Sequence, residues 1–161
     1  MKKLFLLLSF CMLIGCASFG EHSVKATPFN GGAEITQVQL TQIDKVHADV
    51  LAVFKYKTDL EQHGKEDHWV ATDIAQLKEG EYFYGDCEDF ALSSRLLLDR
   101  LGVPSRLVYV KYNDQDHMAL EAGGYLLDNR FKTAISRDVV SYDYIKVSSY
   151  SSGGKWEKIN D

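Results

Sequence analysis

The segment from Asp86 to Pro104 is the most sharply bounded element of this 161-residue chain. Asp86 is a favourable N-cap, and Asp89, three residues on, is placed as in a weak capping box. Gly102 suits a left-handed cap at the C-terminal end, and Pro104 prevents the helix from continuing. The pattern predicts a helix that begins at Cys87 and buries one stripe, formed by Phe90, Ala91, Ser94, Leu97, Leu98 and Leu101.

Cys87 lies at the first position of this helix and not on its apolar stripe, where a structural cysteine would more often be found. The free N–H groups and the positive end of the helix dipole lower the pKa of a thiol at this position. Three neighbouring acids, Asp86, Glu88 and Asp89, raise that pKa through their negative charge. Composition alone leaves open whether the thiol is buried and inert or kept for its chemistry.

The remaining pattern is that of one domain over residues 34–161. Apolar residues at helical spacing predict a helix over 38–56, and the polar stretch 57–69 predicts a loop. A short helix is expected over 72–78, with Thr72 as its cap. Three runs of strand character follow the central helix, over 105–112, 117–122 and 125–129, with a turn over 113–116 between the first two.

Gly123-Gly124 is a two-residue connection of the kind that joins the strands of a β-hairpin. It pairs Ala122 with Tyr125, which makes His117 and Asp128 diagonal cross-strand neighbours, about 7–8 Å apart at the backbone. A thiol, an imidazole and a carboxylate then meet as a nucleophile, its base and the acid that orients the base. The residues alone leave an incidental arrangement open. The competing histidines lie in polar or tether-like stretches and are predicted to be solvated on the surface: His22, His47, His63 and His68.

Two segments, GDCEDFALSSRLLLDRLGVPSRLVYV and HMALEAGGYLLDN, resemble the bacterial transglutaminase-like cysteine proteinases, a group that includes the LapG-type, adhesin-releasing periplasmic proteases. The resemblance covers about residues 67–131 and extends to GKWEKI at 154–159. It implies a papain-like or transglutaminase-like α+β fold, in which the cysteine-bearing helix packs on an antiparallel sheet. It also implies Cys87 as the nucleophile, His117 as the base and Asp128 as the orienting acid.

The same resemblance implies a metal ion but no organic cofactor. In LapG-type relatives the acids that flank the cysteine bind calcium, which here means Asp86 and Glu88, with Asp89 as a third candidate. Calcium accepts oxygen ligands from closely spaced acids, and a bound cation reverses the sign of the local field. The alternative is that the acids only cap the helix, which would give Glu88 no particular task.

We therefore expect a cysteine peptidase that cleaves a periplasmic or surface protein through an acyl-enzyme, with an adhesin as a candidate substrate. LapG-type enzymes are restrained by a regulatory protein, so an inhibitory partner is also a candidate. Two alternatives stay open: transglutaminase or amidase chemistry on protein or cell-wall peptide, and a non-catalytic binding lipoprotein of the same fold.

Trp69 is either a donor to the oxyanion or a core tryptophan beside the helix.

Residues 1–15 form a basic and then apolar leader that ends in Leu-Ile-Gly before Cys16, like the processing box of bacterial lipoproteins. This resemblance implies cleavage before Cys16, acylation of its sulfur and a lipidated tether over 16–33. Ala17 favours the outer membrane, with the domain at its periplasmic face. An ordinary signal peptide and a chance apolar N-terminus are the alternatives. The net charge of −5, with no basic cluster, argues against nucleic acid as a partner.

Overall fold

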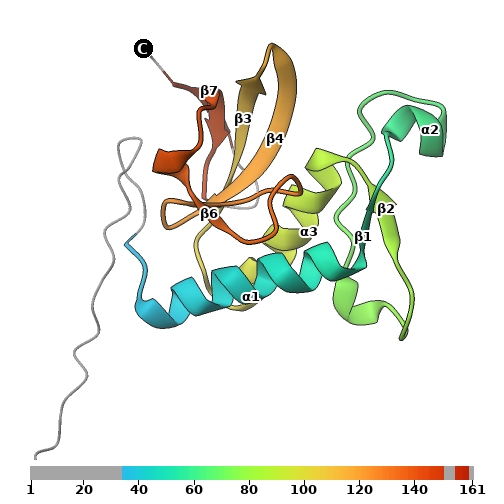
Figure 1. Cartoon of the computed structure of the whole chain (residues 1–161), viewed down its shortest axis with the longest axis horizontal. Helices are drawn as coiled ribbons and strands as arrows, with labels where there is room; N and C mark the ends of the chain where they lie inside the picture. The colour runs from blue at the N-terminus through green and yellow to red at the C-terminus, as the bar shows by residue number, and fades with distance from the viewer. Residues whose placement is uncertain (1–33, 151–154, 160–161) are drawn as a thin grey trace, which may run out of the picture.

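A computed structural model describes residues 34–150 and 155–159. The predicted leader, Cys16 and the tether lie outside these residues and stay predictions. The described chain is an α+β fold, with a six-stranded antiparallel sheet packed against two helices and a two-stranded sheet to one side (Figure 1). No helix within these residues combines the length and the apolar character that crossing a membrane requires.

Helix α1 (Gln37–Val53) ends earlier than the pattern of apolar residues predicts. The last three residues of the predicted range form strand β1 (Phe54–Tyr56), which pairs in parallel with β2 (Phe83–Gly85). Aromatic residues favour strands, and the ring of Phe54 packs against Phe90 with 5.2 Å between the ring centroids. Pairing and ring packing, both made with distant segments, therefore override the helical periodicity.

Two short elements between β1 and β2 also differ from the predictions. The stretch predicted as a loop contains α2 (Asp59–His63), a five-residue helix that starts at a capping box. The helix predicted over 72–78 is a single 3₁₀ turn, η1 (Ile74–Gln76), capped by Asp73 and not by Thr72. Asp73 also pairs with Arg100 at 2.7 Å, which attaches this turn to the central helix.

The large sheet has the strand order β6-β5-β4-β3-β7-β8, and all neighbours are antiparallel. The predicted hairpin is confirmed, because Ala122 pairs with Tyr125 across the two glycines. The preceding turn is shorter than predicted, since Asn113 and Asp114 close it with positive φ angles of 50° and 62°. The strands are β3 (Arg106–Tyr112), β4 (Gln115–Ala122), β5 (Tyr125–Leu127), β6 (Ile135–Ser136), β7 (Asp143–Ser148) and β8 (Trp156–Lys158).

Helix α3 (Cys87–Arg100) is the predicted central helix, with Asp86 as its N-cap and Gly102 in the left-handed region at φ 67°. It packs against β4, and α1 packs beside it (Figure 1). Leu101 was predicted on the buried stripe but is exposed, because it is the C-cap and the helix has already ended. The core between the helices and the sheet includes Ile43, Val46, Val50, Phe90, Leu98, Leu107, Leu120 and Leu127.

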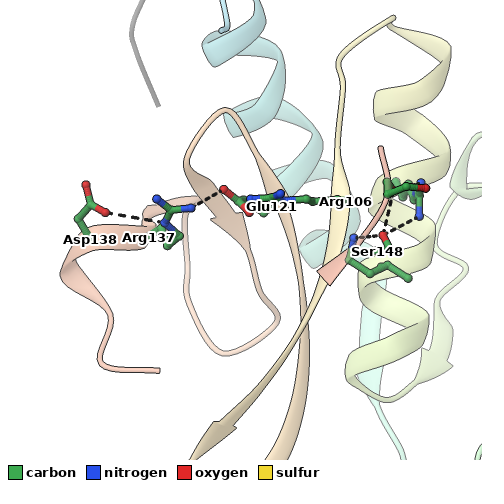
Figure 2. A network of polar contacts seen from close by, with 8 residues as sticks. Arg106, Glu121, Arg137, Asp138 and Ser148 are labelled. Atoms are coloured by element: carbon green, nitrogen blue, oxygen red, sulfur yellow. Dashed lines mark hydrogen bonds and ion pairs between the residues drawn. The ribbon is translucent and has the colours of Figure 1, made fainter. Parts of the chain in front are cut away.

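A buried ion-pair network connects strands β3 and β4 with the segment after β6 (Figure 2). One carboxylate oxygen of Glu121 in β4 accepts from Arg106 of β3 at 2.8 Å. The other accepts from Arg137 of η2 (Arg137–Val139) at 2.9 Å. All three side chains are buried, so each charge depends on its partners for compensation. The network fixes β4, whose other end carries His117.

Glu121→Gln should lower the free energy of unfolding by roughly 3–5 kcal/mol, because two buried guanidinium groups lose the carboxylate that they share. The control is Asp49→Asn, which breaks the exposed 2.7 Å ion pair with Lys45. That change should cost no more than about 0.5 kcal/mol. Urea denaturation followed by circular dichroism measures both variants. Equal losses would show that the network does not stabilise the hairpin.

Candidate active site

Cys87 lies partly buried in the first turn of α3. Its Sγ donates a hydrogen bond to Oε2 of Glu88 at 2.9 Å. Burial is the largest cause that raises the pKa of the Cys87 thiol, and the charge of Glu88 adds to it, while the Met118 N–H acts in the opposite direction. Burial and the acids therefore outweigh the helix N-terminus, and this environment favours the protonated thiol.

His117 and Asp128 lie side by side at the end of the hairpin, as the cross-strand geometry predicts. Nε2 of His117 is 2.9 Å from Oδ2 of Asp128, and both side chains are buried. His117 comes from β4, and Asp128 follows directly after β5. Because Nε2 is directed at the acid, Nδ1 is the ring nitrogen left for a second partner.

Asp128 accepts three hydrogen bonds. Besides His117, the hydroxyl of Tyr142 donates to the same Oδ2 at 2.5 Å, and the backbone N–H of Arg130 donates to Oδ1 at 2.9 Å. Burial alone would raise the pKa of Asp128, but the hydrogen bonds from His117 and Tyr142 outweigh it and lower the pKa. Asp128 is therefore an ionised acid. Tyr142 was missed at the sequence level, because it precedes β7 in a stretch without a motif.

Cys87 and His117 face two open cavities of about 770 and 420 Å³. Both residues line both cavities, and Asp116 is the third residue that the cavities share. Met118 is the residue that follows His117 in β4, and its backbone N–H forms a hydrogen bond with the Cys87 thiol. Sγ therefore lies close to this strand. The thiol and the imidazole that contacts Asp128 thus face the same two cavities.

Trp69 is not a core residue, which rules out one of its two predicted roles. Its side chain is 42% exposed and lines the larger cavity together with Cys87. The ring meets that of Trp156 edge-on, with 6.4 Å between the centroids. Trp69 thus forms part of the cleft wall.

His47 is not solvated, contrary to the sequence prediction. It is fully buried on α1, where Nε2 contacts the carbonyl oxygen of Phe131 at 3.0 Å and the ring meets Phe90 edge-on. Burial lowers its pKa, which favours a neutral imidazole. A signal was available, because His47 lies four residues after Ile43 on the buried face of α1. His63 and His68 are exposed, as predicted, and His22 lies outside the described residues.

The acids around Cys87 divide into two groups that share Asp86. One group contains Asp86, Cys87 and Glu88, and the other contains Asp59, Asp86 and Asp89, each with ligand atoms within 4.8 Å of one another. Asp89 therefore lies with Asp59 of α2 and not with Glu88. Burial, the hydrogen bond with Glu88 and the charge of neighbouring acids raise the pKa of Asp86 to about 8. Mutual repulsion of this kind is what a bound cation relieves.

Asp59 completes a set of oxygen donors that suits a hard divalent cation. It is buried, its Oδ2 accepts the His68 N–H, and its Oδ1 has no hydrogen-bond partner among the described residues. Asp89 is held by the Val70 N–H at 2.7 Å. Gly85 gives that carboxylate room, since a Cβ at this position would lie 2.5 Å from Asp89 Oδ2. Three carboxylates with one orphaned oxygen fit calcium by donor chemistry.

Comparisons with known proteins agree with this fold. The chain matches the family model described as bacterial transglutaminase-like cysteine proteinase BTLCP over residues 10–161. It is similar in structure to Legionella pneumophila LapG, with 22% identity and a TM-score of 0.54, over 73% of this chain and 71% of that one. EGTA-treated Legionella pneumophila LapG gives 21% identity and a TM-score of 0.52, over 74% of this chain and 72% of that one. No curated protein matches the chain significantly.

The two solved structures establish the fold, and the family model covers nearly the whole sequence. The predicted transglutaminase-like α+β architecture, with the cysteine-bearing helix packed on an antiparallel sheet, is therefore confirmed. Members of this family are cysteine peptidases, which makes this protein an enzyme that acts on proteins. The chain belongs to the bacterial transglutaminase-like cysteine proteinases.

Proposed function

We propose that Cys87, His117 and Asp128 form the catalytic triad that hydrolyses a peptide bond in a protein substrate. The observation that carries this proposal is the 2.9 Å pair of His117 and Asp128 beside Cys87, at a cleft open on both sides. The buried, ionised Asp128 fixes the proton of His117 on Nε2 and leaves Nδ1 able to accept the thiol proton.

The reaction then has two halves. The Cys87 thiol gives its proton to Nδ1 of His117, and Sγ attacks the carbonyl carbon of the scissile bond. His117 returns the proton to the leaving amine as the C–N bond breaks, which leaves a thioester on Cys87. Water gives a proton to His117 and attacks the thioester carbon. The carboxylic acid product leaves, and the proton returns to Sγ.

We further propose that Asp59, Asp86 and Asp89 hold a calcium ion. Their converging carboxylates and the orphaned Asp59 oxygen support this, as does the treatment of LapG with the calcium chelator EGTA. A bound calcium ion supplies positive charge beside Cys87, which favours the thiolate. The three acids themselves join α2 to the start of α3. Glu88, which the family resemblance also implied, stays a candidate ligand, because its carboxylate lies within 4.8 Å of that of Asp86, although it also accepts the Cys87 hydrogen bond.

The biological setting we propose is the periplasmic face of the outer membrane, reached through a lipid on Cys16. The substrate is then a periplasmic or surface protein, with an adhesin as the candidate, and an inhibitory regulatory protein is the candidate partner. The family match supports a protein substrate. The identity of the substrate and the lipid anchor rest on the sequence resemblances alone.

Cys87→Ala and His117→Ala should each abolish proteolysis, and the double variant should be no less active than either single variant, because the residues act as a unit. The assay compares new protein termini in the surface proteome of bacteria that carry the wild type or a variant. His63→Ala is the matched control, since this exposed histidine lies outside the triad. Retention of most activity in either triad variant would refute the mechanism.

EGTA should inactivate the enzyme, and calcium should restore it. Calcium at about a hundred times its Kd should also raise the free energy of unfolding by about 2.7 kcal/mol, because it binds the folded state alone. Asp59→Asn and Asp89→Asn should remove this gain, which calorimetry and calcium titration measure, while the exposed control Asp49→Asn should keep it. Full activity of metal-stripped protein, confirmed by elemental analysis, would show that the acids act without a metal.

Cys16→Ser should move the protein from the membrane fraction to the soluble periplasm without loss of peptidase activity, because the acylated sulfur is lost and the triad is untouched. Fractionation with mass spectrometry of the N-terminal peptide measures both effects. Cys11→Ser is the control, since this residue leaves with the predicted leader and its loss should change nothing. A wild-type protein that is already soluble and unacylated contradicts the lipoprotein proposal.

A further inference from the structure

The smaller of the two cavities beside Cys87 is rich in hydrogen-bond donors. It has a volume of about 420 Å³ and reaches from Cys87 and His117 to Arg130. The larger cavity carries several acids together with Lys146 and Lys158, and the Lys146 ammonium lies over the rings of Tyr109 and Trp156, 4.8 Å from each centroid. The remaining lining of the smaller cavity is Tyr56, Tyr112, Asn113, Gln115, Asp116 and Asn129.

Arg130 is an exposed residue whose guanidinium stacks on aromatic rings at the edge of this cavity. Its central carbon lies 3.8 Å from the centroid of the Tyr112 ring and 5.5 Å from that of Tyr142. The two rings meet edge-to-face, with 5.7 Å between their centroids, and form a corner for the side chain. The backbone N–H of Arg130 is bound to Asp128, two residues before it. Arg130 is therefore positioned both through its backbone and through its side chain.

This guanidinium forms no ion pair with a carboxylate of the described residues. The only acid among the lining residues of the cavity is Asp116, which pairs with Lys111 at 3.5 Å and accepts a hydrogen bond from Tyr109. Stacking on an aromatic ring engages the face of a guanidinium and leaves the N–H groups at its edge free to bind an anion. A planar carboxylate is the group that such a fork binds best.

We infer that the smaller cavity binds the side-chain carboxylate of a Glu or Asp in the substrate, next to the scissile bond, and that Arg130 determines this specificity. The inference rests on the proposed triad only for the place of the scissile bond, which must lie at Cys87. The substrate is thus a polypeptide with an acidic residue on the side of the cleavage site that enters this cavity. The opposite side meets the larger cavity, whose lining combines acids and lysines with an aromatic wall.

The test uses pools of synthetic decapeptides, blocked at both ends, in which one position is Glu in one pool and Gln in its match. Wild-type protein with calcium should cleave the Glu pool about tenfold faster in kcat/KM at one position, mainly through KM. Arg130→Gln should bring the Glu-to-Gln ratio close to one. Lys132→Gln, which removes an exposed charge two residues away and outside both cavities, should keep the tenfold ratio. A ratio near one in the wild type, or an unchanged ratio in Arg130→Gln, overturns the inference.

A binding measurement separates this inference from the proposed triad. In ¹⁵N-labelled Cys87→Ala protein, the blocked peptide Ala-Glu-Ala should shift the Nε–Hε resonance of Arg130, and Ala-Gln-Ala should not. Equal shifts with both peptides, or none with either, overturn the inference. If no pool is cleaved but the Glu peptide shifts Arg130 selectively, the triad proposal fails and the carboxylate site stands.

Discussion

The buried carboxylate of Asp128 is the point on which the geometry of the site depends. A buried charge costs several kcal/mol unless donors compensate for it, and Asp128 receives donors from β4, from the residue before β7 and from its own turn. These segments are far apart in sequence, so the carboxylate is satisfied only when the sheet is complete. His47 of α1 supports the same turn through the Phe131 carbonyl. The helix layer and the sheet thus both position one acid.

The environment of Cys87 raises a different physical problem. A reactive thiol needs positive charge nearby, yet Glu88 accepts its hydrogen bond and other acids surround it. A buried cluster of carboxylates is costly for folding when nothing neutralises it. The same acids are well placed as an N-cap and as anchors for α2 and the loop before Trp69. Charge repulsion at the start of α3 therefore makes both the structure and the chemistry sensitive to a cation.

Most features that depend on local sequence could be predicted, although the capping box of α2 was missed, and those that depend on distant pairing could not. The caps of α3 and the Gly-Gly hairpin are determined by residues that are adjacent in the sequence. Together they predicted the positions of Cys87, His117 and Asp128 in the fold. Asp59 could not be found in this way, because only the parallel pairing of β1 and β2 and the capping of α2 bring it to Asp89. The early end of α1 has the same origin, since the strand that replaces its last turn needs β2 as a partner.

Tyr142 packs on both the proposed recognition residue, Arg130, and the proposed base, His117. Its hydroxyl donates to Asp128, while its ring forms one side of the corner that holds the Arg130 guanidinium. Arg130 in turn binds Asp128 through its backbone and contacts the tyrosine rings through its side chain. A carboxylate bound as we infer would therefore contact the side chain that packs on Tyr142, whose ring centroid lies 5.9 Å from that of His117. In the carboxylate site that we infer, Tyr142 is thus the ring that packs on both Arg130 and His117.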